Sequence, residues 1–136
     1  MPFVPSVASP APPSSPRVAW WVGFGAATAL ALALTWAAYA ERMPIAMNRV
    51  THLDKGFHVG LAGLLAFFLD GALRRRDVRL AGRLLVPLAV LGVLLPTGIE
   101  ELLQGLSAVR EPSLWDFAAD TVGAAGFTWL SRRVAT

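Results

Sequence analysis

The chain has 136 residues, of which 55% are hydrophobic and only 15% are charged, and its mean hydropathy is +0.55. This balance argues against an ordinary soluble domain, in which about a quarter of the residues are charged, and indicates lipid as the solvent. The formal net charge is only +3, and the absence of cysteine excludes disulfides and thiolate metal sites.

Residues 1–16, MPFVPSVASPAPPSSP, are rich in Pro, Ser and Ala and contain no charged side chain. This composition predicts an extended, disordered tail that precedes the folded part of the chain. The apolar run that follows is too long for a signal peptide and has no basic leader before it. We therefore expect this run to be retained as a membrane span.

Four apolar stretches lie within residues 17–136, at 18–40, 56–73, 84–103 and 114–130. Each is near the roughly 20 residues that a helix needs to cross a bilayer. The last three contain ionisable residues, but they lack the charged stripe along one face that a soluble bundle would show. The sequence therefore predicts an all-α fold, an integral membrane four-helix bundle forming one domain. Pro87 and Pro96 are expected to bend its third helix.

The basic residues predict the orientation of the bundle. Eight of the 12 lie in the N-terminal segment, the second connection and the C-terminal segment, which a four-span topology places on one side. Because positive loops stay inside, both termini are predicted to be cytoplasmic, in the cytoplasmic membrane of a bacterium. The arginines at 74–83 have no aromatic platform beside them, so they indicate topology and contact with anionic lipid, and no nucleic-acid partner is expected.

Polar side chains gather where three of the predicted spans reach the outer face. We call this set the polar cap; it consists of Asp54, Lys55, His58, Glu101, Gln104, Arg110, Asp116 and Asp120. Residues four apart share a helix face, so Asp54 lies with His58, and Asp116 with Asp120. Since ionisable groups at a membrane need partners, we predict that the cap converges at one end of the bundle.

Two other features of the spans predict contacts within the structure. Gly56 and Gly60 flank His58, and Gly123 and Gly126 follow Asp120, at spacings that let membrane helices approach closely. We interpret these four glycines as packing positions. Asp70 lies four residues before Arg74, so the two are predicted to form an ion pair at the cytoplasmic interface.

The linked spacing of the cap residues resembles the VanZ-like family of small bacterial membrane proteins. The matching pattern is D54-K55-x-x-H58, E101-x-x-Q104, R110, D116-x-x-x-D120 and G123-x-x-G126. The family usually has Asn where this chain has Asp120, which adds a negative charge here. The resemblance implies a role at the cell envelope, and the namesake of the family is associated with resistance to the glycopeptide teicoplanin. It does not imply a biochemical activity.

Three classes of function fit the polar cap. The first is binding of an envelope ligand, either a lipid-linked cell-wall precursor or a glycopeptide, with Lys55 and Arg110 toward phosphate or carboxylate. The second is a membrane-embedded enzyme in which His58 and a carboxylate act as acid and base on a lipid-linked group. The third is a cation site or proton path, and transport by so small a bundle would need a homo-oligomer.

A purely structural interpretation also stays open, in which the charges of the cap only satisfy one another. Among the functional classes we expect binding, with the lipid bilayer as a partner and with no cofactor, no metal and no assigned catalytic residue.

Overall fold

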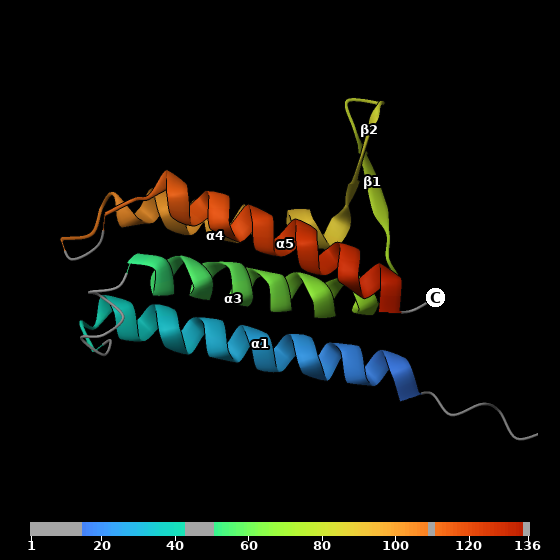
Figure 1. Ribbon diagram of the computed structural model, residues 1–136, viewed down its shortest axis with the longest axis horizontal. Helices are drawn as coiled ribbons and strands as arrows, with labels where there is room; N and C mark the ends of the chain where they lie inside the picture. The colour runs from blue at the N-terminus through green and yellow to red at the C-terminus, as the bar shows by residue number, and fades with distance from the viewer. Residues whose placement is uncertain (1–14, 43–50, 109–110, 135–136) are drawn as a thin grey trace, which may run out of the picture.

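The computed structural model describes residues 15–42, 51–108 and 111–134, which form four helices and one β-hairpin (Figure 1). The elements in chain order are α1 (Ser15–Tyr39), α3 (Thr51–Ala72), β1 (Asp77–Leu80), β2 (Leu84–Pro87), α4 (Leu88–Gln104) and α5 (Leu114–Val134). The predicted all-α class is confirmed. Arg17–Tyr39 is the one segment of the described residues that is long and apolar enough to cross a membrane by length and composition.

The other three helices differ from α1 for visible reasons. α4 is only 17 residues long, and α3 and α5 carry ionisable side chains along their length. A membrane four-helix bundle is therefore not confirmed.

The helices run up and down along the long axis of the molecule, with α3 at the centre (Figure 1). α3 contacts α1, α4 and α5, and its most extensive contact is with α5. The start of α1, the hairpin and the end of α5 lie at one end of the bundle, and the α4–α5 connection lies at the other (Figure 1). This is the arrangement of connections that an up-and-down four-span topology requires.

Three predicted spans coincide closely with helices, which extend into the polar residues at their ends. α1 begins at Ser15, two residues inside the predicted tail, and residues 1–14 of that tail lie outside the described residues. The first turns of α3 and α5 contain Asp54 and Asp116, and the last turn of α5 contains Arg132 and Arg133. Anions at the start and cations at the end of a helix are favoured by the helix dipole, so these charges support the added turns.

The predicted start of the third span at residue 84 is wrong, because the run LLVP forms β2 of an antiparallel hairpin with β1. The turn between the strands contains Ala81 and Gly82, whose φ angles of 49° and 72° are left-handed and reverse the chain. Pro87 therefore precedes α4 instead of bending it, whereas Pro96 does lie inside α4. The hairpin projects from the bundle (Figure 1).

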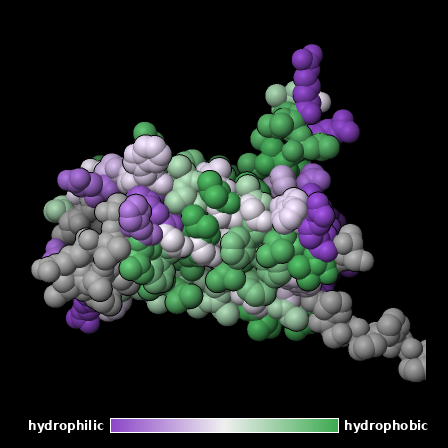
Figure 2. All heavy atoms as spheres, viewed as in Figure 1, coloured by the Kyte–Doolittle hydropathy of each residue, from purple (hydrophilic) through white to green (hydrophobic). Residues whose placement is uncertain are grey.

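The distribution of polar and apolar side chains is inverted relative to a soluble protein. The buried apolar core is built mainly from alanine, with Leu69 and Val93 among the few larger side chains. Seven polar side chains are buried with it: Asp70, Glu101, Gln104, Asp116, Asp120, Thr128 and Ser131. Large apolar side chains face outward, and Leu102 and Val122 are 78% and 65% exposed. Figure 2 shows hydrophobic residues along the bundle, and hydrophilic residues at its ends and on the hairpin.

Asp70 joins three elements at the end of the bundle that carries the hairpin. Its side chain is fully buried, and its Oδ1 accepts a hydrogen bond of 3.1 Å from Arg132, which also donates to Asp77 of β1 at 2.8 Å. The hydrogen bond to Asp77 is the main reason that the pKa of Arg132 is raised. Asp70 thus pairs with Arg132 and not with the predicted Arg74, because α3 ends at Ala72 and Arg74 has a left-handed φ of 57°.

Candidate functional site

Lys55 and two carboxylates form the outermost part of the polar cap. Lys55 Nζ makes an ion pair with Asp116 Oδ1, without hydrogen-bond alignment, and lies 3.5 Å from Asp54 Oδ2. The Asp116 side chain is only 8% exposed, whereas that of Asp54 is 42% exposed. The pair joins the first turn of α3 to the first turn of α5, so the lysine neutralises a carboxylate that is buried between two helices.

His58 lies one turn further along α3, between two carboxylates of α5. Its Nδ1 is 2.9 Å from Asp120 Oδ1, and its Nε2 is 3.8 Å from Asp116 Oδ2. With the proton on Nδ1, the imidazole donates to Asp120 and leaves Nε2 as an acceptor. The i, i+4 spacing places the two residues of each pair on one helix face. α3 and α5 run parallel, with their first turns side by side, so the two pairs meet.

Glu101 fixes the start of α5. Its Oε2 accepts a 2.8 Å hydrogen bond from the backbone N–H of Ser113, whose own Oγ accepts one of 3.3 Å from the N–H of Asp116. Ser113 is thus the N-cap of α5, and its own N–H is bound by a glutamate, as in a capping box. Here the glutamate comes from α4 and not from α5. The buried Glu101 therefore has a structural role in addition to its place in the polar cap.

Gln104 belongs to a second hydrogen-bonded group around Glu100. Gln104 Nε2 donates to Glu100 Oε2 at 2.6 Å, and the Tyr39 hydroxyl at the end of α1 donates to Glu100 Oε1 at 3.1 Å. The remaining oxygens, Glu101 Oε1 and Gln104 Oε1, are buried and accept no hydrogen bond within the described part of the chain.

The structure brings together six members of the polar cap, whereas Gln104 is hydrogen-bonded to Glu100 on its own helix, and Arg110 lies outside the described residues. Asp54, Lys55 and His58 come from α3, Glu101 and Gln104 from α4, and Asp116 and Asp120 from α5. The contacts of Tyr39, Glu100 and Ser113 were not predicted from the sequence. Two features of the sequence could have indicated them. The single tyrosine lies at the end of the first apolar stretch, and a second glutamate lies beside Glu101.

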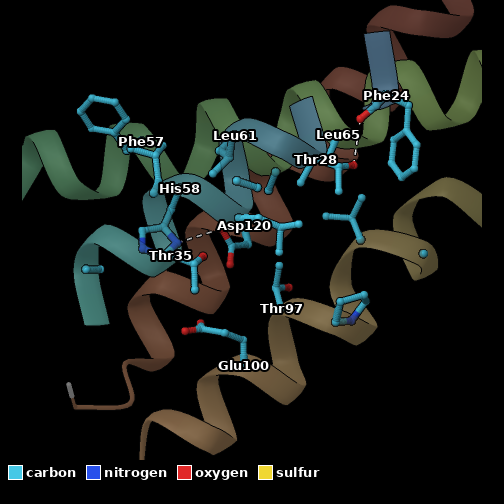
Figure 3. A pocket seen from close by; sticks show the side chains of 18 of the residues that line it. Phe24, Thr28, Thr35, Phe57, His58, Leu61, Leu65, Thr97, Glu100 and Asp120 are labelled. Atoms are coloured by element: carbon cyan, nitrogen blue, oxygen red, sulfur yellow. Dashed lines mark hydrogen bonds and ion pairs between the residues drawn. The ribbon is translucent and has the colours of Figure 1, made fainter. Parts of the chain in front are cut away.

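A groove of about 430 Å³ opens beside the cap, between α1, α3 and α4 (Figure 3). Its polar end is lined by four side chains: Asp54, His58, Glu100 and Asp120. The rest of the lining is mostly apolar and runs along α1 from Phe24 to Ala38. The volume is in the range of small-molecule sites, so the groove and the cap together form the candidate functional site.

The four predicted packing glycines differ in their surroundings. A Cβ on Gly123 would collide with the backbone carbonyl of Val59, so α5 approaches α3 closely at this point. Gly56, Gly60 and Gly126 have open space where a Cβ would lie. Close helix packing therefore depends on Gly123, directly below Asp120 on α5.

Three residues of the cap have donor atoms close enough to share a cation. The ligand atoms of Asp54, His58 and Asp116 lie within 4.8 Å of one another. Lys55 already contacts one of these carboxylates and lies near the other, which balances part of their charge. A metal ion would compete with this ammonium group, so the geometry favours the ion pair.

Comparisons with protein-family models, with curated proteins and with solved structures return no match for this chain. The resemblance to the VanZ-like family therefore stays a prediction from the residue pattern.

Proposed function

We propose that the protein is a four-span integral membrane protein of the bacterial cytoplasmic membrane, with both termini in the cytoplasm. The main support is the inverted surface, because a bundle with buried carboxylates and outward-facing leucine, valine and tryptophan is unfavourable in water and suited to lipid. Arginines of the hairpin region and of α5 lie at the end that carries the N-terminus of α1. The positive-inside tendency assigns that end to the cytoplasm and the polar cap to the outer face.

We further propose that the protein acts at the cell envelope, as the VanZ-like resemblance implies. In this proposal the cap and the groove bind an extracytoplasmic ligand, either a lipid-linked cell-wall precursor or a glycopeptide, and contribute to glycopeptide resistance. One observation carries the proposal: a groove of ligand size ends at a cluster of carboxylates and a histidine held by three helices. Intramembrane ionisable groups arranged around a cavity are typical of a functional site.

The environment of His58 favours acid–base catalysis as the second candidate. The imidazole is hydrogen-bonded to Asp120 through Nδ1, and the side chain lines the groove, as a general base oriented by a carboxylate would. A catalytic site of this kind would act on a ligand group placed within hydrogen-bond reach of Nε2. A binding site asks only for a hydrogen-bonding group at the same position.

Substitution of His58 separates the two candidates. Glutamine keeps donor and acceptor groups but cannot exchange a proton near neutral pH, so His58→Gln should largely preserve binding and should lower catalysis by about 10²–10⁴-fold. The measurement is glycopeptide susceptibility of a sensitive host that contains each variant at matched membrane levels. We expect His58→Gln to protect nearly as well as the wild type.

Two variants complete this experiment. His52→Gln is the matched control, because His52 is exposed near the start of α3. Arg110→Ala should abolish protection under either candidate, since it removes the predicted basic contact for the ligand. Loss of protection by His58→Gln, with a lipid species altered only by the wild type, would establish catalysis. A wild-type protein that gives no protection would exclude the resistance role.

A further inference from the structure

The groove is polar at one end only. Three carboxylates and one imidazole line its outer end, from Asp54, His58, Glu100 and Asp120. The rest of the described lining consists of aliphatic and aromatic side chains, glycine, proline and threonine. Figure 3 shows His58 beside Asp120, and Phe24 at the opposite end of the groove. A site with this division matches an amphipathic molecule better than a uniformly polar one.

Two of the three threonines that line the groove, Thr28 and Thr97, add little polarity to its apolar part. Thr28 Oγ1 donates to the backbone carbonyl of Phe24 at 2.8 Å, and Thr97 Oγ1 donates to that of Leu94 at 3.3 Å. Because these hydroxyls use their protons within their own helices, they leave no strong donor for an occupant. The apolar part therefore suits a hydrocarbon chain.

The length of the groove fits an extended chain. Its α1 wall runs from Phe24 to Ala38, which corresponds to roughly 21 Å at 1.5 Å per helical residue. α1 and α4 both pack on α3, and the groove lies between them, with the Tyr39–Glu100 hydrogen bond joining them at its polar end. In the proposed membrane setting the groove faces the bilayer, so a lipid can enter sideways without crossing water.

The charge of the polar end restricts the head of the occupant. No lysine or arginine is among the described residues that line the groove. Lys55 is paired with Asp116 and lies 3.5 Å from Asp54, so it balances only part of the negative charge at this end. Three carboxylates would repel a phosphate or carboxylate head in a site of low dielectric constant, and would attract an ammonium group. Glu100 and Asp120 are held by protein hydrogen bonds, so these acceptors are already oriented.

We propose that the groove binds the hydrocarbon chain of an amine-bearing lipid, with the amine against Asp54, Glu100 and Asp120. This inference rests on the proposed function and narrows its ligand to an amphipathic molecule that carries a positive charge where head and chain meet, which excludes a lipid whose head is joined to the chain through phosphate. The lipid enters between α1 and α4.

The test uses the full chain in nanodiscs of phosphatidylcholine and phosphatidylglycerol. Three photoreactive diazirine probes share one long alkyl chain and end in a primary amine, a hydroxyl or a carboxylate. We expect capture to fall in that order and the cross-links to map to groove walls such as Leu32, Leu61 and Val93. Equal capture of the amine and carboxylate probes, or cross-links spread over the outward faces of the helices, would overturn the proposal.

Two substitutions on α1 provide a matched pair. Ala31 lines the groove, whereas Ala33 is exposed on the same helix and does not line it. Ala31→Phe should fill the groove and lower amine-probe capture about tenfold, a loss of roughly 1.4 kcal/mol in binding free energy. Ala33→Phe should leave capture unchanged. Equal capture by the two variants would contradict binding in the groove.

A head-group variant keeps the test decisive if Ala31→Phe does not fold. Asp54 is more exposed than Asp116 and lies further from Lys55, so the Asp54→Asn protein should fold. It should reduce capture of the amine probe several-fold and leave capture of the hydroxyl probe unchanged. An unchanged preference for the amine would contradict the assignment of the head to this end.

Failure of this inference is distinguishable from failure of the proposed function. If Ala31→Phe still protects the host and Arg110→Ala does not, the cap binds its ligand without the groove, and only the lipid inference fails. If the wild type does not protect, the resistance role fails, while the probe experiment still decides whether the groove takes an amine-bearing lipid.

Discussion

Asp116→Asn is expected to lower the free energy of unfolding by about 3 kcal/mol, because it leaves the Lys55 ammonium without its buried partner. Asp116 is almost completely buried at the start of α5, and Lys55 contacts it from α3. Loss of the negative charge also weakens the first turn of α5, where the helix dipole favours an anion. Thermal unfolding of the purified protein in detergent micelles, followed by circular dichroism, measures the change.

The same lysine offers its own control. Asp54 lies 3.5 Å from Lys55 but is 42% exposed, so Asp54→Asn should cost less than about 1 kcal/mol. The double variant Lys55→Met/Asp116→Asn should recover most of the stability lost in Asp116→Asn, since removing both partners leaves no buried charge uncompensated. Equal effects of Asp54→Asn and Asp116→Asn would show that burial does not decide the strength of these pairs.

Two glycines one turn apart on α5 should respond to alanine with opposite sign. A Cβ at Gly123 would collide with the Val59 carbonyl, so Gly123→Ala must push α5 away from α3 and should destabilise the bundle by about 1–3 kcal/mol. Gly126 has open space around it, so Gly126→Ala should be neutral or stabilise α5 by up to about 1 kcal/mol through helix propensity.

The Gly123 substitution should also disturb the polar cap. Asp120 lies one turn before Gly123 on α5, so a displaced α5 separates Asp120 from His58. We expect Gly123→Ala to weaken ligand capture and stability together, and Gly126→Ala to change neither appreciably. Thermal unfolding in micelles and probe capture in nanodiscs measure both effects. A Gly123→Ala protein as stable as the wild type would contradict the close approach of α3 and α5.

Hydropathy located the helices because each presents an apolar surface over most of its length. It failed at Leu84–Pro87, where four apolar residues continue the pattern of α4 but belong to a hairpin strand. Hydropathy does not distinguish a short exposed strand from the first turn of a helix. The turn at Ala81 and Gly82 decides the outcome, and a single glycine beside alanine is a weak turn signal.

The members of the cap could be predicted from spacing, but their partners could not. The i, i+4 rule places Asp54 with His58 and Asp116 with Asp120 because it depends on one helix alone. The pairing of Lys55 with Asp116, and of His58 with Asp120, depends on the register of α3 against α5. That register is set by contacts far apart in the chain, such as Gly123 against Val59.

Asp70 and the groove illustrate the same dependence on tertiary structure. The buried partner of Asp70 is Arg132, separated from it by 62 positions in the chain, and the local i, i+4 rule favoured a neighbour instead. The groove exists because α1 and α4 rest on α3 without closing on each other. No pattern within a single helix encodes that separation.

In the proposed topology the polar cap faces the outside of a membrane and the hairpin faces the cytoplasm. The chain has no cysteine, so one cysteine can be introduced at each end, at Ala108 after α4 and at Ala81 in the hairpin turn, both of which are exposed. Intact cells containing Ala108→Cys or Ala81→Cys are treated with a membrane-impermeant maleimide, and permeabilised cells serve as the reference. Ala108→Cys should be labelled in intact cells, and Ala81→Cys only after permeabilisation. Labelling of Ala81→Cys in intact cells, or of Ala108→Cys only after permeabilisation, would contradict the proposed topology.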